Sequence, residues 1–384
     1  MKIITVIGAR PQIIKAAGLS RAIKENFSKE MEEVIIHTGQ HYDENMSNVF
    51  FTELGIPKPN YNLNVGSGKH GQQTARMIEG IEEILEKEIP DAIVVYGDTN
   101  STLAAGVAAA KMHIPIVHIE AGLRSYNKKM PEEINRIMCD HASTLLFSPT
   151  KAGVDNLVKE GFKCNAEPPY SMDHPGVFHC GDIMYDNSLF FSKLSDQQSN
   201  VVKENSLEPN NYVLSTIHRN DNTDQPERLS GIFEAILELI EKHNIQFVLP
   251  LHPRTAKLLE TNTSSELYAK IKSEKRLKVI EPVSFLDMIA LEKNAKIIVT
   301  DSGGVQKEAF FFEKPCVILR PETEWVELVA CGAAAIVGWH KDKIVTAFDH
   351  FISSKDIKFP SLFGDGQSGK FMCEKMIESF TIQD

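Results

Sequence analysis

Short apolar runs rich in β-branched residues alternate with helical stretches along almost the whole chain, and this alternation most constrains the fold. In the first half, strands are predicted at residues 3–7, 33–37, 92–96, 114–118 and 144–148, and helices at 13–24, 71–87, 101–112 and 131–142. In the second half, strands are predicted at 212–217, 246–250, 277–280, 297–300 and 316–319, and a helix at 227–242. Such alternation implies right-handed crossovers and predicts doubly wound parallel α/β sheets.

The chain has 384 residues, which is too long for one core of usual size and predicts two domains. Residues 164–186 interrupt the strand–helix rhythm, contain two adjacent prolines and are expected to be the linker. We therefore expect Rossmann-like domains at 1–183 and 184–365, followed by a segment at 366–384. Two such sheets facing across a cleft would place ligands at the carboxyl ends of their strands.

Charge and cysteine usage exclude several classes of function. The formal net charge of -11 argues against a nucleic-acid partner and against an anionic membrane surface. The six cysteines are scattered without a C-x-x-C pair, as is typical of reduced thiols in a cytoplasmic protein, and their spacing predicts no metal site. The apolar run at the N-terminus is too short for a membrane span and indicates a first buried strand.

A turn of small residues follows the predicted strand at 297–300. It reads Asp301-Ser302-Gly303-Gly304 and leads into a helix that carries Glu308. Free N–H groups at a helix N-terminus favour an anion such as phosphate, and glycines let the backbone approach a ligand. Glu308 could accept hydrogen bonds from a ribose. The alternative is a plain strand-to-helix turn with Asp301 or Ser302 as the cap.

Basic residues follow other predicted strands. Arg10 and Lys15 follow the first strand near a helix N-terminus, a suitable place for a pyrophosphate, or else they form a solvated basic pair. In the second half His218 and Arg219 end one strand, and the next strand end repeats this pairing with His252 and Arg254. A single histidine is usually structural, but the repeated pairing opposite a phosphate loop favours a binding role.

Three carboxylates in the first half lie at predicted strand ends or at a predicted helix start. Asp98 follows a strand, where it could also be a simple N-cap, and Glu120 ends a strand where no structural need for a charge is evident. Glu132 lies in the first turn of a helix and could pair with Arg136, four residues later. Carboxylates move protons on sugar rings, and basic groups stabilise a leaving diphosphate. This division of labour favours a nucleotide-sugar reaction.

Together these motifs resemble the non-hydrolysing UDP-N-acetylglucosamine 2-epimerase family over nearly the whole chain. The matches occur in the family's order, at residues 8–15, 38–41, 97–99, 118–124, 131–136, 216–219, 252–254 and 301–304. The resemblance implies a glycosyltransferase-B-like architecture, a C-terminal helix at 366–384 that packs back on the first domain, and a homodimer.

The resemblance also implies a mechanism without NAD or metal. An acidic residue removes the C2 proton of the sugar, UDP leaves from C1 to give a 2-acetamidoglucal, and UDP re-adds while a proton returns to the opposite face of C2. By the match, the acid/base candidates are Asp98, Glu120 and Glu132, and His218 contacts the diphosphate. The implied UDP contacts are Arg10, Lys15, Ser302, Gly303 and Gly304, with Glu308 at the ribose and the backbone near Val283 at the uracil.

Four departures from the commonest family pattern point to one branch. They are Gln12 in place of a glutamate, the stretch at 66–74, the run at 218–222 in place of H-R-R-E-N, and Trp325 in place of an arginine. These features resemble the branch acting on UDP-2,3-diacetamido-2,3-dideoxyglucuronate, with UDP-GlcNAc as the other expected substrate, and they put regulation by a second UDP-sugar in doubt.

Three other functions fit parts of the pattern. A glycosyltransferase of the same fold would need one base and an acceptor site, whereas this chain has three acidic motifs. A hydrolysing epimerase usually carries a different first motif from the Arg10-Pro11-Gln12 found here. A non-catalytic sensor of nucleotide sugars would not need Asp98, Glu120 and Glu132 together.

Overall fold

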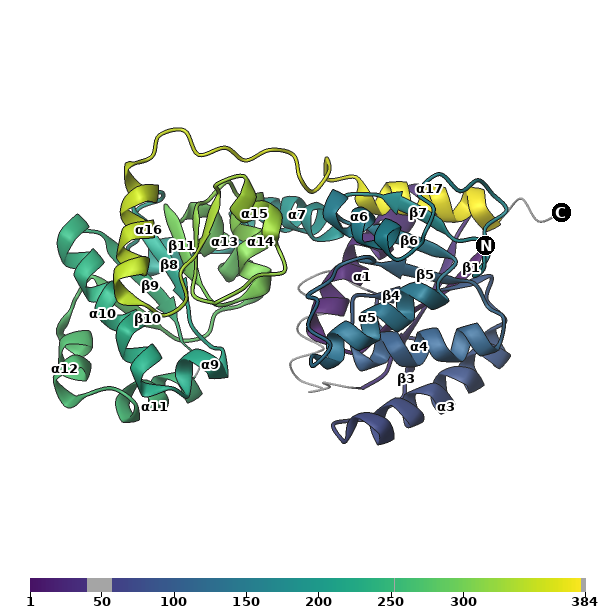
Figure 1. The fold of residues 1–384 in the computed structure, drawn as a ribbon, viewed down its shortest axis with the longest axis horizontal. Helices are drawn as coiled ribbons and strands as arrows, with labels where there is room; N and C mark the ends of the chain where they lie inside the picture. The colour runs from purple at the N-terminus through teal and green to yellow at the C-terminus, as the bar shows by residue number, and fades with distance from the viewer. Residues whose placement is uncertain (40–56, 252, 381–384) are drawn as a thin grey trace. The chain divides into compact units, whose positions relative to one another are not determined.

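The computed structural model describes residues 1–39, 57–251 and 253–380, and they form two compact units (Figure 1). The first unit consists of Met1–Asn187 together with the C-terminal segment from Ser361, and the second is Ser188–Pro360. Among the described residues, no helix is both long and apolar enough to cross a membrane.

A parallel sheet of seven strands forms the centre of the first unit, in the order β3-β2-β1-β4-β5-β6-β7. Its strands are β1 (Lys2–Ile7), β2 (Glu32–His37), β3 (Tyr61–Asn62), β4 (Ala92–Tyr96), β5 (Ile116–Ile119), β6 (Leu145–Ser148) and β7 (Gly176–His179). The order reverses between β1 and β4, and the carboxyl ends of strands at such a switch point form a crevice for ligands.

Helices between these strands bury their apolar faces on the sheet. They are α1 (Arg10–Ala22) with its π-helical extension η1 (Ile23–Phe27), α3 (His70–Glu88), α4 (Asn100–Lys111), α5 (Pro131–Ala142) and α6 (Lys151–Lys159). Helix α4 buries small alanines against the core, and α3 adds Met77, Ile81 and Leu85. The C-terminal helix α17 (Ser368–Phe380), yellow in Figure 1, packs against α1 and η1.

The second unit repeats this plan with a parallel sheet of six strands, in the order β10-β9-β8-β11-β12-β13. These are β8 (Tyr212–Thr216), β9 (Gln246–Pro250), β10 (Leu277–Ile280), β11 (Ile297–Thr300), β12 (Cys316–Ile318) and β13 (Ala334–Ile336). The order reverses between β8 and β11. Buried isoleucines, leucines and phenylalanines from both the strands and the helices form a continuous core.

The helices of the second unit are α8 (Val201–Glu204), α9 (Asn220–Thr223), α10 (Pro226–His243), α11 (Pro253–Thr261), α12 (Ser265–Ser273), α13 (Phe285–Asn294), α14 (Gly303–Phe311), α15 (Val326–Ala330) and α16 (Lys341–Ser353). They lie between these strands, except that α8 precedes the first strand and α16 follows the last. Helix α7 (Ile183–Gln198) begins in the first unit and continues into the second.

The prediction of a linker at 164–186 is wrong. Residues Gly176–His179 of that stretch form β7, which pairs with β6 at the edge of the first sheet, and α7 begins at Ile183. Proline, aspartate and histidine in the stretch suggested irregular structure throughout. A four-residue edge strand gives too short an apolar signal to stand out against that composition.

Candidate active site

The first group of candidate residues lies at the switch point of the seven-stranded sheet. Gly8 follows β1, and a Cβ built there would lie 2.0 Å from Ser101 Oγ and 2.3 Å from Thr38 Oγ1, so the turn admits no side chain. Helix α1 begins directly afterwards with the exposed Arg10. Lys15, one turn further, is buried. The structure therefore separates the predicted basic pair into one exposed and one buried cation.

Gln12, one of the four departures named above, holds this turn. Its Oε1 accepts hydrogen bonds from the N–H groups of Gly8 (2.9 Å) and Ala9 (3.1 Å). Its Nε2 donates to Tyr96 O and to Thr102 Oγ1, both at 2.9 Å. A carboxylate could not make the last two donations. The amide therefore joins the end of β1 to the end of β4 without adding a charge.

Asp98 follows β4 and is held from α5. Arg136 Nη2 binds Asp98 Oδ2, and Asn135 Nδ2 donates to Asp98 O at 2.9 Å. Burial raises the pKa of Asp98, Arg136 and Lys15 oppose that rise, and Glu120 adds to it. A carboxyl with a raised pKa beside two cations can take up and release a proton nearer neutral pH than a free aspartate.

Glu120 follows β5 in a left-handed backbone conformation, with φ of 72°. Its Oε1 lies 2.6 Å from Lys15 Nζ, and both side chains are about a tenth exposed (13% and 11%). A Cβ built on Gly97 would lie 3.3 Å from Lys15 Nζ and 3.4 Å from Glu120 Oε1, which puts the Asp98 turn against this ion pair. A strained non-glycine residue at a strand end is typical of a functional site.

The predicted pairing of Glu132 with Arg136 is wrong. The partner on α5 is the buried Glu133, whose Oε2 lies 2.6 Å from Arg136 Nη1. Glu133 also accepts hydrogen bonds from the N–H groups of Ser125 and Tyr126, both at 2.9 Å. Glu132 is exposed at the start of the helix. Helix phase explains the difference, since three-residue spacing also brings side chains together and buries Glu133 instead.

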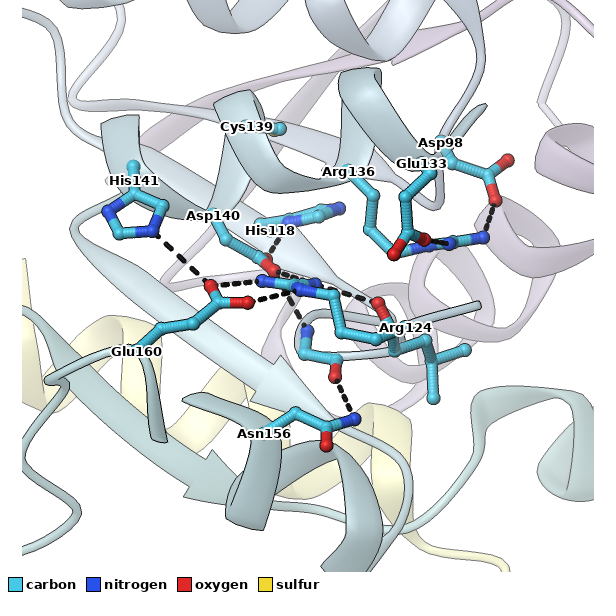
Figure 2. A network of polar contacts seen from close by, with 12 residues as sticks. Asp98, His118, Arg124, Glu133, Arg136, Cys139, Asp140, His141, Asn156 and Glu160 are labelled. Atoms are coloured by element: carbon cyan, nitrogen blue, oxygen red, sulfur yellow. Dashed lines mark hydrogen bonds and ion pairs between the residues drawn. The ribbon is translucent and has the colours of Figure 1, made fainter. Parts of the chain in front are cut away.

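A buried network behind these carboxylates holds their turns (Figure 2). His118 Nε2 lies 2.8 Å from Gly97 O and its Nδ1 lies 2.7 Å from Asp140 Oδ1. Asp140 Oδ2 also accepts from Gly122 N (3.1 Å) and lies 2.7 Å from Arg124 Nη1. Both ring nitrogens of His118 face acceptors, so both must donate, and the ring is an imidazolium.

The electrostatics of His118 agree with this assignment. Burial lowers its pKa, but the neighbouring Cys139 and Asp140 raise it, and the net pKa lies well above its ordinary value. The network contacts Gly97, the residue before Asp98, and Gly122, which lies in the turn after Glu120. His118 thus fixes the backbone on which both carboxylates stand, a function that its place in a matched motif did not reveal.

The second group of candidate residues lies at the switch point of the six-stranded sheet. Ser302 Oγ accepts from Val305 N at 3.4 Å, so Ser302 is the N-cap of α14, as the plain-turn interpretation allowed. A Cβ on Gly304 would have no neighbour closer than 3.9 Å, and the second atom it would approach, at 4.0 Å, is Glu308 Oε2. Ser302 therefore caps α14, and the N–H groups at the start of this helix remain open beside the Glu308 carboxylate. The two interpretations of the turn are compatible.

Asp301 fixes the loop that carries the predicted diphosphate contacts. The buried carboxylate accepts hydrogen bonds from His218 N (3.1 Å), Arg219 N (3.0 Å) and Asn222 Nδ2 (3.1 Å). His218 Nδ1 lies 3.3 Å from Asp301 Oδ1, and the His218 side chain is 53% exposed. The motif at 301–304 therefore positions the motif at 218–219 across the β8–β11 junction.

The remaining predicted residues are more scattered. Arg254 donates to Asn220 Oδ1 (2.7 Å) and Asp224 Oδ1 (2.6 Å), beside the His218 loop. Val283 lies between β10 and α13. His252 lies outside the described residues.

Two further pairs involve the glycine turn and the helix that follows it. Arg320 donates to both carboxylate oxygens of Glu324 (2.9 and 2.8 Å), and a Cβ on Gly303 would lie 3.7 Å from each partner. Lys307 Nζ lies 4.1 Å from the centre of the Trp325 ring. Arg320 also lines a pocket of about 370 Å³ in this unit.

Comparisons with known proteins agree with this geometry. Residues 22–377 match the family model described as UDP-N-acetylglucosamine 2-epimerase. The chain belongs to this family. A Pseudomonas aeruginosa relative, a UDP-2,3-diacetamido-2,3-dideoxy-D-glucuronate 2-epimerase, is 46% identical, covering 97% of this chain and 99% of the relative. A UDP-N-acetylglucosamine 2-epimerase homolog from Methanococcus maripaludis is 49% identical, covering 96% and 97%.

A solved structure of a family member shows the same fold. The Methanocaldococcus jannaschii UDP-GlcNAc 2-epimerase, in complex with UDP-GlcNAc and UDP, has a TM-score of 0.82 and 42% identity, covering 98% of this chain and all of that chain. The predicted family, the glycosyltransferase-B-like fold class of two parallel-sheet domains and the assignment as a carbohydrate epimerase are confirmed.

Within the described parts of the chain, histidines, cysteines and carboxylates do not cluster into a group that could hold a metal ion. The independence of the epimerase from metal and NAD stays a prediction.

Proposed function

We propose that this protein is a non-hydrolysing UDP-N-acetylhexosamine 2-epimerase that inverts C2 by elimination and re-addition of UDP. The single observation that carries the proposal is the pairing of Asp98 with Arg136 and of Glu120 with Lys15 at one switch point. An epimerase must serve both faces of a ring carbon, and two adjacent strand ends supply two carboxylates. Full-length similarity to family members supports the same activity.

The proposed reaction balances without a redox step. A carboxylate takes the C2 proton, the electrons of the C–H bond form a C1–C2 double bond, and the C1–O bond breaks to release UDP. Re-addition reverses these steps with the proton delivered to the other face of C2. Asp98, Glu120 and Glu132 are the acid/base groups of this proposal, and neither NAD nor a metal is required.

Departure of UDP must drive the step, because the C2–H bond is only weakly acidic. Preorganised donors are the usual way to stabilise such a leaving group. We assign this to His218, Arg219 and the N–H groups at Ser302, Gly303 and Gly304. The proposal further assigns Glu308 to the ribose and the backbone at Val283 to the uracil, with Arg10, Lys15, Arg136, His252 and Arg254 as additional contacts.

The proposed substrate is UDP-2,3-diacetamido-2,3-dideoxyglucuronate, with UDP-GlcNAc as the alternative in the same reaction class. Support comes from the Pseudomonas aeruginosa relative and from the four sequence departures, Gln12 and Trp325 among them. The product would be a precursor of surface polysaccharide such as O-antigen. We further propose a homodimer in the cytoplasm, in line with six free cysteines.

Proton NMR in deuterated water tests the activity directly. The protein is incubated with each UDP-sugar separately, without NAD, metal or acceptor. Deuterium at C2 together with a manno-configured product is expected, and the faster substrate identifies the branch. Folded protein that binds UDP but gives neither exchange nor product with either sugar would contradict the proposal and favour a glycosyltransferase.

Two neighbouring glutamates offer a matched pair of variants for the site itself. Glu132→Gln should lower kcat by about 10²-fold or more with little change in stability, as expected for an acid/base group. Glu133→Gln should lower stability by about 2 kcal/mol, since a buried acceptor of charged and backbone donors is weakened. Steady-state kinetics and urea unfolding on both variants separate the two roles, and the opposite assignment of effects would reject Glu132.

A further inference from the structure

Glu292 is a buried acid that the proposed reaction does not use. It lies near the end of α13, and its side chain has no solvent exposure. Among the described residues, no donor group reaches either of its carboxylate oxygens. An ionised carboxylate in such a place would cost several kcal/mol without a compensating partner. The site therefore requires a neutral acid.

The groups that face Glu292 come from three elements of the second unit. Glu308 on α14, which packs against α13, lies close enough for its carboxyl group to interact with that of Glu292. Tyr212 on β8 and Cys316 on β12 also lie close enough to be affected by its charge. The Tyr212 hydroxyl donates elsewhere, to Leu291 O at 2.6 Å. None of these facing groups is a cation.

A bond between two carboxyl groups requires that one of them carries the proton. Burial raises the pKa of Glu292 well above its ordinary value, and the nearby Glu308 charge raises it further. Glu308 is less buried and directs Oε2 toward Gly304 at the open start of α14. Glu292 is thus the neutral donor, and Glu308 is the ionised acceptor.

We propose that Glu292 is a positioning residue whose protonated carboxyl donates to Glu308 and holds that carboxylate toward the 2′- and 3′-hydroxyls of the UDP ribose. This inference rests on the proposed binding of UDP through Glu308. A neutral donor locks the side chain while leaving a full negative charge to accept from the hydroxyls. A cation in the same place would hold Glu308 equally well but would weaken it as an acceptor.

Discrimination between UDP and 2′-deoxyuridine 5′-diphosphate measures this role. Calorimetric Kd values for both ligands are compared in wild type, Glu292→Gln and Glu292→Met. Wild type should bind UDP about tenfold more tightly or better, as expected for a hydrogen bond to a charged group. Gln keeps an N–H donor and should retain most of this ratio. Met has a similar volume but no donor. In Glu292→Met the ratio of the two Kd values should fall toward one, because UDP binds more weakly.

Three results would overturn the inference, and they are distinguishable. An unchanged ratio in Glu292→Met, with UDP still bound and C2 exchange still detected, rejects Glu292 alone. Equal Kd values in wild type reject the Glu308–ribose contact. A wild type that binds neither ligand also removes the proposed function. Thermal unfolding of each variant controls for folding.

An infrared measurement tests the same claim without relying on the Met variant. The difference spectrum between wild type and Glu292→Gln at pH 8 should contain the C=O band of a protonated carboxyl group. A spectrum that contains carboxylate bands only would overturn the assignment, because an ionised Glu292 could not donate to Glu308.

Discussion

The two units build their sites on equivalent switch points but stabilise buried acids differently. In the first unit the acids of the candidate site and of the network behind it face cations: Asp98 and Glu133 face Arg136, Glu120 faces Lys15, and Asp140 lies between His118 and Arg124. In the second unit Asp301 is held mainly by backbone and amide N–H groups, and we propose that Glu292 is held by donating its own proton to Glu308. Glu324, beside the glycine turn, instead pairs with Arg320.

This difference matches the work proposed for each unit. Proton transfer needs carboxyl groups whose pKa values are set by nearby charges, and ion pairs supply that control. Binding of an anionic diphosphate needs donors that remain available, so Asp301 is better satisfied by N–H groups than by the cations the ligand requires. Variants that break one of these arrangements at a time test the comparison.

The largest effect is expected for Asp98→Asn. It removes a proposed acid/base group while keeping its shape, so kcat should fall by about 10³-fold, within the range for general acid–base catalysis. The Kd for UDP should change little, because Asp98 is not assigned to UDP. NMR rates of C2 exchange and calorimetric titration measure both quantities. A variant that keeps more than a tenth of wild-type kcat would remove Asp98 from the mechanism.

Breaking the buried network behind the carboxylates should mainly lower stability. His118→Leu leaves Asp140 with one cation fewer and leaves the Gly97 carbonyl without a donor. Loss of one partner from a buried ion pair typically costs about 3–5 kcal/mol, which urea unfolding will detect. Nitrogen chemical shifts of His118 in wild type should report an imidazolium at pH 8. A neutral ring there would leave Arg124 as the cation that faces Asp140.

Asp301→Asn tests the arrangement in the second unit. The amide offers one acceptor where the carboxylate offered two, and it turns an N–H₂ toward the N–H groups of His218 and Arg219. We expect a loss of about 2 kcal/mol, smaller than for His118→Leu because Asp301 is held mainly by neutral N–H donors. UDP affinity should fall as the loop loosens. If UDP affinity and stability are both unchanged, Asp301 does not hold this loop.

The sequence allowed us to predict which residues lie at strand ends, but not which of these residues contact one another. Asp98 and Glu120 were found because each directly follows an apolar run. The role of Asp301 escaped notice because it depends on β8 and β11 being neighbours, although about eighty residues separate the motifs. Glu133 was missed because spacing alone does not fix which face of a helix is buried, and β7 because its apolar run is short.

The smallest effects are shifts of the acid limb in the pH profile of kcat/KM. A base must be ionised, so activity falls as the pH drops through the raised pKa of Asp98. Arg136 and Lys15 both lower that pKa, with Arg136 the stronger, and Glu120 raises it. The limb should therefore move to higher pH in Arg136→Gln and by less in Lys15→Gln, and to lower pH in Glu120→Gln, each by about one unit or less.

The sign of these shifts, rather than the residual activity, is the informative quantity. All three variants lose activity for other reasons, because each partner has its own proposed role. The folding contribution of Asp98 has the opposite pH dependence to its activity: with a raised pKa it is greatest below pH 3.8 and is lost as the pH rises. If the acid limb lies at the wild-type pH in all three variants, Asp98 is not the titrating base. The cations of the first unit would then only hold the turns in place.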